Sequence, residues 1–393
     1  MNNIIFYGHS PNLGGAEKSL FELVKSVKLE NRFTPIVILP SKEGLMTNWY
    51  KSEMIDVKIL DFPWMISDNS DQDLDEFMSQ VHTSYNQHLN LILSLKPTAI
   101  FTQTSVQSIS AICAANLEIP HFWNIREYGA IDHKLNEIIK NTCGVEQFIS
   151  LSDKIYVSSK ALGNYLFGSR KVNWEPLYSQ PKSQSLGEEK VKENQNYFRF
   201  VFAGSLTPSK NPLLLINFAL NLKESGFKFK IDVFGIGELG NELRSFINDY
   251  GISDQIELMG HNSDLENLYM NYDFVISCAP NEAFGRSLSE GAVRGCIPIY
   301  PQIESWSERF IDGETGISYP LEDPRAMAKK IIALSSDSEI QRIRKNLKLL
   351  SSEGFGIPDP AHIFMRDLDK VVREKYRKKF INRELINLLK LEV

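Results

Sequence analysis

The sequence predicts an α/β protein with two domains, each containing a parallel β-sheet. Short apolar segments of strand length alternate with segments of helical period along most of the 393 residues. Such alternation is typical of strand–helix–strand units, which form parallel sheets with helices on both faces. The alternation stops at a polar stretch, residues 179–196, and then starts again. Because 393 residues correspond to about two to three domains of ordinary size, each half is expected to be one domain.

The first half begins with a strand, a glycine-containing loop and a helix. Ile4–Tyr7 is apolar, Gly8–Gly15 contains three glycines, and the apolar residues that follow recur at steps of three and four. Those apolar residues are Ala16, Leu20, Leu23, Val24 and Val27. The other predicted elements of this half are strands at Ile36–Leu39, Val57–Leu60, Ala99–Thr102, Phe122–Ile125 and Lys154–Ser158, with helices at 80–95 and 106–116.

A polar segment separates this half from a second set of strands and helices. Ser179–Asn196 is rich in Ser, Gln, Lys and Glu, which is typical of a linker. The predicted strands of the second half are Phe200–Gly204, Phe229–Phe234, Ile256–Met259, Phe274–Ser277 and Ile297–Tyr300, with helices from about 212 and over 239–250. We therefore expect a first domain at 1–175, a linker at 176–198, a second domain at 199–360, and a helix at 361–393 that packs on the first domain.

The composition is that of an ordinary globular protein. Hydrophobic residues make up 42% and charged residues 23%, which excludes a disordered, collagen-like or coiled-coil chain. No apolar run approaches the roughly 18–20 residues that cross a bilayer, and the first residues lack the basic region of a signal peptide. The cysteines Cys113, Cys143, Cys278 and Cys296 are far apart, which is typical of reduced thiols. We therefore expect a cytoplasmic protein.

The net charge of −6 is unevenly distributed. Residues 1–150 contain 11 Lys and Arg against 17 Asp and Glu, whereas residues 151–393 are balanced. An acidic first half disfavours a nucleic-acid groove there, and it also disfavours a flat contact with an anionic bilayer. The late basic cluster Lys375, Arg377, Lys378 and Lys379 fits a solvated helix face, and a weak peripheral membrane contact is the alternative.

Two glutamates eight residues apart flank a predicted strand-to-helix turn. Glu282 follows a strand and Glu290 falls early in the next helix, with Gly285 between them. A glycine lets the backbone turn closely, so that free amides of the first helical turn can face an anion. Carboxylates suit the hydroxyls of a ribose and of a sugar. The simpler alternative is a helix cap followed by a solvated helix face.

This stretch resembles the Glu-x7-Glu signature of retaining, family 4-type glycosyltransferases of the GT-B fold, the glycosyl transferases group 1. The resemblance implies two Rossmann-like domains facing across a cleft, with the first domain on the acceptor side. It extends over further segments in the expected order. These segments are Gly14–Glu17, Phe202–Pro212, Gly295–Ile299 and Ile311–Ile317.

The resemblance also implies roles for individual residues. Glu282 would lie beside the donor sugar, Glu290 would bind the nucleotide ribose, and Lys210 would neutralise the diphosphate. The other implied donor contacts are Gly14, Gly15, Gly204, Ser205, Gly235, Phe284, Gly285 and Arg286. The implied donor is a nucleotide sugar, with a UDP-sugar favoured, and the implied acceptor is a saccharide, a lipid-linked glycan or a protein-linked glycan. The implied reaction retains the anomeric configuration and needs neither metal nor cofactor, because Lys210 and backbone amides carry the charge.

Three positions depart from the family pattern, and one of them is Pro298, which falls one residue later than the commonest spacing. Ser205 stands where the family usually has an arginine for the diphosphate, and we expect Arg286 to supply that cation. Arg126 stands where the family often has a histidine, and we place it with Glu282 and Lys210 in the catalytic set. A partner subunit that binds sugar nucleotides without catalysis is the alternative that these departures leave open.

Other motifs point to different chemistry. Gly235–Gly240 satisfies Gly-x-Gly-x-x-Gly, and Glu257 stands where a ribose-binding acid would be sought, so an NAD-dependent enzyme is a third alternative. The NAD fingerprint, however, follows the first strand of its domain, and this motif follows the second. The acidic run Asp71, Asp73 and Asp75 imitates a metal motif but fits a solvated loop better, and the histidines lack metal-ligand spacing. His9 follows the first strand and is a minor candidate for the site. Nothing in the sequence indicates an oligomeric state.

Overall fold

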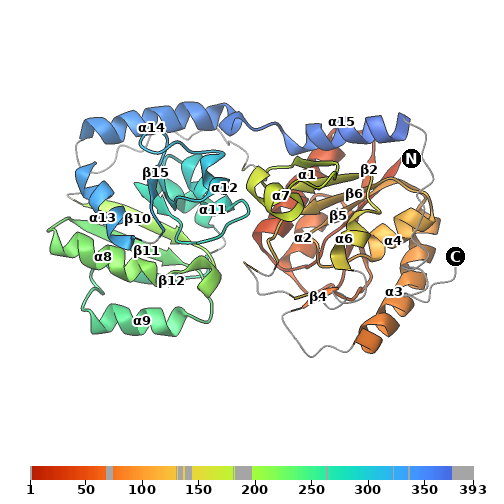
Figure 1. The fold of residues 1–393 in the computed structure, drawn as a ribbon, viewed down its shortest axis with the longest axis horizontal. Coiled ribbons are helices and arrows are strands. Elements are labelled where there is room, and N and C mark those ends of the chain that lie inside the picture. The colour runs from red at the N-terminus through yellow and green to blue at the C-terminus, as the bar shows by residue number, and fades with distance from the viewer. Residues whose placement is uncertain are drawn as a thin grey trace. The chain divides into compact units, whose positions relative to one another are not determined.

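The computed structural model describes residues 2–67, 74–129, 131, 136–137, 144–179, 181, 197–262, 264–321, 323–334 and 337–373. The chain forms two compact units, each with its own parallel sheet (Figure 1). The first unit comprises Met1–Ser179 with Pro358–Val393, and the second comprises Gln180–Ile357. The predicted linker at 176–198 lies mostly outside the described residues.

The first unit is built on a seven-stranded sheet in the order β3-β2-β1-β5-β6-β8-β9, in which every pairing is parallel. Its strands are β1 Asn3–Tyr7, β2 Thr34–Leu39, β3 Asp56–Ile59, β5 Pro97–Gln103, β6 His121–Ile125, β8 Lys154–Val157 and β9 Trp174–Pro176. A short antiparallel pair joins β4 Ile66–Ser67 to β7 Asn136–Glu137. Its helices are α1 Gly15–Leu29, α2 Leu45–Ser52, α3 Leu74–Leu95, α4 Ile109–Asn116, α6 Gly144–Ile149, α7 Lys160–Phe167 and α15 Pro360–Arg373.

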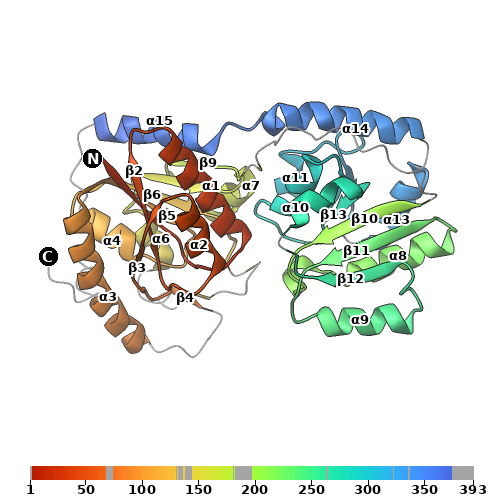
Figure 2. The ribbon, with the colours of Figure 1, turned by 180° about the vertical axis from the view of Figure 1, so that it is seen from behind.

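Helix α15 belongs to the first unit although it follows the whole second unit in the sequence. Figure 1 and Figure 2 both draw it in blue beside the red and orange elements of the first unit. Phe364 is fully buried, and its ring meets the rings of Phe6, Phe101 and Phe122 edge-on at 5.2–5.9 Å. This helix therefore covers one face of the sheet with apolar contacts.

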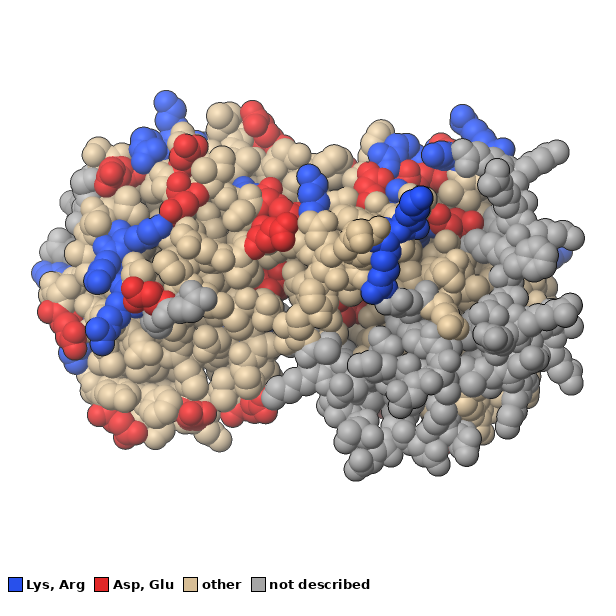
Figure 3. Space-filling view, viewed as in Figure 1, with Lys and Arg blue, Asp and Glu red and all other residues tan. Residues whose placement is uncertain are grey.

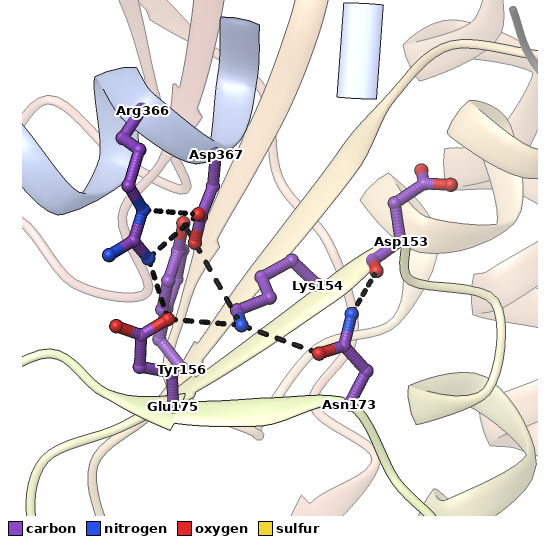
Figure 4. Close-up of polar contacts among 7 residues, drawn as sticks. All are labelled: Asp153, Lys154, Tyr156, Asn173, Glu175, Arg366 and Asp367. Atoms are coloured by element: carbon purple, nitrogen blue, oxygen red, sulfur yellow. Dashed lines mark hydrogen bonds and ion pairs between the residues drawn. The ribbon is translucent and has the colours of Figure 1, made fainter. Parts of the chain in front are cut away.

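A polar cluster fixes the same helix to the edge of the sheet (Figure 4). Asp367 accepts a hydrogen bond of 2.9 Å from the Tyr156 hydroxyl. Glu175 is bonded at 2.7 Å to Arg366 and at 3.1 Å to Lys154. Burial raises the pKa of Tyr156 well above its usual value, and the Asp367 carboxylate raises it further, so this tyrosine stays a neutral donor. The cluster adds directional contacts to the apolar ones. The predicted helix beyond Arg373, with the basic cluster Lys375–Lys379, lies outside the described residues.

The second unit is built on a six-stranded parallel sheet in the order β12-β11-β10-β13-β14-β15. Its strands are β10 Phe198–Ala203, β11 Phe229–Phe234, β12 Ile256–Gly260, β13 Phe274–Ile276, β14 Ile297–Pro301 and β15 Ile317–Tyr319. Its helices are α8 Leu214–Glu224, α9 Gly240–Asp249, α10 Leu265–Leu268, α11 Arg286–Ala292, α12 Glu304–Ser307, α13 Pro324–Ala333 and α14 Asp337–Ser352. Short 3₁₀ turns lie at η1 Pro208–Lys210, η2 Tyr269–Asn271 and η3 Gly354–Gly356.

Successive side chains of the central strand β10 enter two different apolar clusters. Phe200 and Phe202 pack with α8 and α13 on one face, whereas Val201 packs with α11 and η2 on the other. Because both faces are covered, residues 200–203 of the strand form an uninterrupted apolar run, as expected for a buried parallel sheet. This burial is why the strand could be predicted from the sequence.

The predicted long strands are observed, and the short ones at the sheet edges were missed. β9 is only half-buried, and β15 has Ser318 between its two apolar residues, so neither produces a clear apolar run. On the face of the second unit shown in Figure 3, Lys and Arg atoms are interspersed with Asp and Glu atoms among neutral surface, in line with the balanced charge of residues 151–393. Within the described part of the chain, no helix is both long and apolar enough to span a membrane.

Candidate functional site

The predicted site residues of the second unit gather at the carboxyl ends of its strands. The chain runs outward from β10 through β11 to β12, and then crosses to β13 and continues outward on the other side. The switch in direction therefore lies between β10 and β13, which is where open α/β sheets bind ligands. Lys210 follows β10 and Glu282 follows β13, so the two strands that border the switch point each contribute one charged residue.

Lys210 and Glu282 form a direct ion pair. Lys210 Nζ lies 2.5 Å from Glu282 Oε2, and the side chains are 31% and 14% exposed. Lys210 ends the turn η1, which begins with a proline and closes at Asn211 in a left-handed conformation with φ of 47°. The rigid turn fixes the direction of the lysine, while the exposure leaves the pair open to an exchange of partners.

The glycine motif at 235–240 lets the loop after β11 pack closely against the loop after β10. A Cβ on Gly235 would lie 1.8 Å from the carbonyl oxygen of Gly204, and one on Gly237 would lie 2.4 Å from that of Leu206. Backbone hydrogen bonds of 2.9 Å join Leu206 to Ile236 and Leu239. Glu257 is exposed at the second position of the edge strand β12. Close packing of the loops after β10 and β11 therefore explains the glycines without a dinucleotide.

The segment from Glu282 to Glu290 turns sharply into α11. Gly285 precedes the helix with φ of 68°, and a Cβ there would lie 1.9 Å from Cη2 of the buried Trp306. Both the left-handed conformation and the close ring therefore require glycine. Within α11, Arg286 Nε donates a hydrogen bond of 3.0 Å to Glu290 Oε1. Both residues are less than a tenth exposed, so the expected diphosphate cation and the expected ribose acid are bonded to each other.

Arg309 is a site residue that the sequence reasoning missed. It is 4% exposed, and Nη1 donates a hydrogen bond of 2.5 Å to Ser289 Oγ while Nη2 donates to the Phe284 carbonyl. Its guanidinium also lies over the Phe284 ring, 3.9 Å from the centroid. A lone arginine after α12 is part of no motif, so no sequence signal could have found it.

The loop at Ile311–Ile317 is held by its own polar side chains. Asp312 accepts hydrogen bonds of 2.7 Å from the Ser318 amide and 2.6 Å from Lys330. Burial raises the pKa of the Asp312 carboxyl, but these two partners outweigh it and the pKa is lowered. The Tyr319 hydroxyl donates a hydrogen bond of 2.9 Å to the Ser277 carbonyl, which ties β15 to the end of β13.

Gly14, Gly15 and Arg126 lie in the first unit. Gly14 precedes α1, where a Cβ would lie 2.5 Å from the Glu17 carboxylate. His9 Nε2 lies 3.1 Å from that same carboxylate, so it is a local partner of the glycine loop. Arg126 follows β6, and its amide donates a hydrogen bond of 3.1 Å to Glu127.

Glu127 is a second residue that the sequence reasoning missed. It is 7% exposed, and Oε1 accepts hydrogen bonds of 2.5 Å and 2.6 Å from the amide and hydroxyl of Ser105. The carboxylate therefore joins the segments that follow β5 and β6. In the sequence it is one glutamate among several, and only the fold shows that it is buried.

Residues 185–348 match the family model described as Glycosyl transferases group 1. The chain is similar to an uncharacterized glycosyltransferase of Methanocaldococcus jannaschii, with 25% identity over 240 residues that cover 60% of this chain and 64% of that protein. It is also similar to the GtfA subunit of a UDP-N-acetylglucosamine–peptide N-acetylglucosaminyltransferase of Streptococcus gordonii. That match has 26% identity over 163 residues, 39% of this chain and 32% of the streptococcal protein. The chain thus spans less than two thirds of either relative.

The structure is similar to that of Anabaena HepE in complex with UDP and glucose. The TM-score is 0.71 at 17% identity, and the match covers 95% of this chain and 100% of HepE. This likeness and the two parallel sheets confirm the predicted GT-B fold. Residues 185–348 of this chain are therefore similar to the glycosyl transferases group 1 family, and the chain has a GT-B fold.

Proposed function

We propose that this protein is a retaining glycosyltransferase that moves a hexose from a nucleotide sugar to a glycan acceptor. The observation that carries the proposal is the Lys210–Glu282 ion pair of 2.5 Å at the switch point of the second sheet. Glu290, in the helix that follows Glu282, supplies a further carboxylate on the same segment. One cation and two carboxylates match a ligand that combines a diphosphate with hydroxyl-bearing sugar rings.

The chemistry follows from an exchange of partners at this pair. When a donor binds, its diphosphate takes the place of Glu282 as the partner of Lys210, and Glu282 is released to accept hydrogen bonds from the sugar. The bond between the anomeric carbon and the diphosphate oxygen then breaks. The acceptor oxygen bonds to that carbon on the same face, and its hydroxyl proton passes to the departing diphosphate oxygen. Lys210 stabilises the negative charge that develops on the departing diphosphate, so the charge needs no metal ion.

A UDP-sugar is the donor that we favour, with a saccharide, lipid-linked glycan or protein-linked glycan as acceptor. The streptococcal relative carries UDP-N-acetylglucosamine and peptide in its name, and the HepE complex contains UDP and glucose. The net charge of −6 over residues 1–150 supports a neutral or shielded acceptor over a polyanion.

Thermal unfolding with UDP, GDP, dTDP or NAD tests the proposal. A ligand at about 100 times its dissociation constant adds about 2.7 kcal/mol to the free energy of unfolding, which raises the melting temperature measurably. We expect UDP to give the largest shift. If none of the three nucleoside diphosphates raises the melting temperature of the folded protein, the proposal is wrong. A rise with NAD alone would favour a dehydrogenase.

A second candidate is a sugar-nucleotide-binding partner subunit without transferase activity. The bond of 3.0 Å between Arg286 and Glu290 favours it, because the cation expected to compensate for Ser205 is already engaged. Release of UDP from a UDP-sugar separates the two candidates. The transferase releases UDP and Glu282→Ala stops the release while UDP still binds, whereas the partner subunit binds UDP and releases none from the sugar.

A further inference from the structure

The loop that carries Phe284 and Gly285 is held by a buried arginine from a different segment. Arg309 follows α12, and its two terminal nitrogens bond to the Phe284 carbonyl and to Ser289 Oγ. The guanidinium also lies over two aromatic rings, 3.9 Å from the centroid of Phe284 and 4.8 Å from that of Trp306. A planar fork with several donors can make both bonds at once, which an ammonium group cannot do in the same geometry.

The bond to the Phe284 carbonyl fixes the orientation of a whole peptide group. A trans peptide is planar, and its C=O and N–H point in opposite directions. Because the Phe284 carbonyl points at Arg309, the amide N–H of Gly285 points away from Arg309. Gly285 has φ of 68°, and glycine also tolerates negative φ, so this peptide could turn over without a side-chain clash at residue 285. Arg309 and the Trp306 ring beneath Gly285 remove that freedom.

We propose that Arg309 is a positioning residue that holds the Gly285 amide ready to donate to the diphosphate of the donor. This inference rests on the proposed function, because the anion is the nucleoside diphosphate of that same site. Arg309 is buried, so it acts through the peptide group and not by touching the donor. A hydrogen bond from an amide to an ionised oxygen is strong only if the amide is already aimed at it.

Calorimetric titration of UDP and of uridine, which lacks the phosphates, tests this role. We expect Arg309→Met to weaken UDP binding by about tenfold to a hundredfold, the range of a lost hydrogen bond to a charged group, while uridine binding changes by less than about threefold. Arg309→Lys should fall between, since its ammonium group can keep one of the two hydrogen bonds. The control is Arg344→Met, which removes an arginine bonded at 2.5 Å to Asp273 before β13, at the opposite end of the sheet, and should leave both affinities unchanged.

The outcomes separate this inference from the proposed function. Unchanged UDP binding in folded Arg309→Met overturns the positioning role alone, and so does an equal loss of UDP and uridine binding, which indicates general damage. If Arg309→Met does not fold, Arg309→Lys and Ser289→Ala take its place, each removing part of the anchor and each expected to weaken UDP binding selectively. Wild-type protein that binds no nucleoside diphosphate overturns the proposed function and the positioning role together.

Discussion

The two ends of the sheet in the second unit both carry acidic and basic side chains, but they use them differently. At the amino end, Asp273 accepts bonds from the Arg199 amide and from Arg344, and inside β11 Asp232 accepts bonds of 2.9 Å from Arg199 and 2.7 Å from Tyr272. At the carboxyl end, Lys210 and Glu282 form a partly exposed pair, beside the buried pair of Arg286 and Glu290. Several bonds to each buried carboxylate make a structural anchor, whereas one accessible pair can exchange its partner for a ligand.

The largest expected effect comes from breaking the exchangeable pair. Lys210→Met removes the cation that would stabilise the departing diphosphate, so the release of UDP from a UDP-sugar should slow by about a hundredfold to a thousandfold. The melting temperature should change little, because the pair is partly exposed. Lys223→Met, at an exposed lysine on α8, is the matched control. Equal rates for Lys210→Met and the control would remove Lys210 from the mechanism.

The amino end should respond in the opposite way. Asp273→Ala removes a carboxylate partner of Arg344 and of the Arg199 amide, and removing one member of a buried ion pair costs about 3–5 kcal/mol. We expect a loss of that order in the free energy of unfolding in urea, with unchanged affinity for UDP. The exposed Asp254 provides the control substitution Asp254→Ala. A weaker UDP affinity in Asp273→Ala would show that the two ends are not independent.

His88 in the first unit is a buried titratable group that stays neutral at pH 7, in contrast to the charged pairs of the second unit. Its Nδ1 lies 2.9 Å from the Tyr7 hydroxyl, and burial lowers the pKa of His88 from 6.5 to about 4. Between about pH 6.5 and pH 4, the unfolded chain therefore binds a proton at this histidine that the native protein does not bind. The free energy of unfolding falls as the pH drops through this range. The loss amounts to about 3 kcal/mol.

Urea unfolding at pH 7 and pH 4.5 measures this loss. His88→Gln should flatten the dependence on pH, whereas His82→Gln, at an exposed position on the same helix, should keep it. An identical pH dependence in wild type and His88→Gln would mean that this histidine does not control acid stability.

The smallest expected effect is at the pair between Asp312 and Lys330. Both side chains are at least a third exposed, and exposed ion pairs contribute about 0–1 kcal/mol. The pKa of Asp312 is lowered in the folded protein, so the contribution is present above the usual aspartate pKa and disappears as the pH falls. Lys330→Met should therefore cost less than about 1 kcal/mol at pH 7 in urea unfolding, with the exposed Lys329→Met as control. A larger loss in the free energy of unfolding would contradict the small contribution that we expect from this pair.

Burial explains which parts of the fold could be predicted from the sequence. Strands such as β1 and β10 are covered on both faces, so their residues form apolar runs that stand out. β9 is only half-buried and β15 has a serine between two apolar residues, so the apolar pattern is weak in both, although each pairs with the strand that precedes it in the sequence. The position of α15 on the first sheet depends on contacts between Phe364 and phenylalanines of three separate strands.

The residues of the candidate site also differ in whether the sequence could predict them. Lys210, Glu282 and Glu290 stand in motifs with fixed spacing, and the fold brings Lys210 to Glu282. The engagement of Arg286 with Glu290 depends on their positions one turn apart in α11, which the predicted helix boundary left open. Arg309 and Glu127 gain their importance from tertiary packing, which a local pattern does not record.

Calorimetric titration of UDP into the wild type, Lys210→Met and Arg344→Met is the most direct test of the difference between the two ends. We predict that UDP binds the wild type and Arg344→Met with the same affinity, and that it binds Lys210→Met at least about tenfold more weakly because a charge-assisted contact is lost. Equal affinities for all three proteins, or no binding of UDP, GDP or dTDP to the wild type, would contradict the claim that the carboxyl-end pair exchanges its partner for a nucleoside diphosphate.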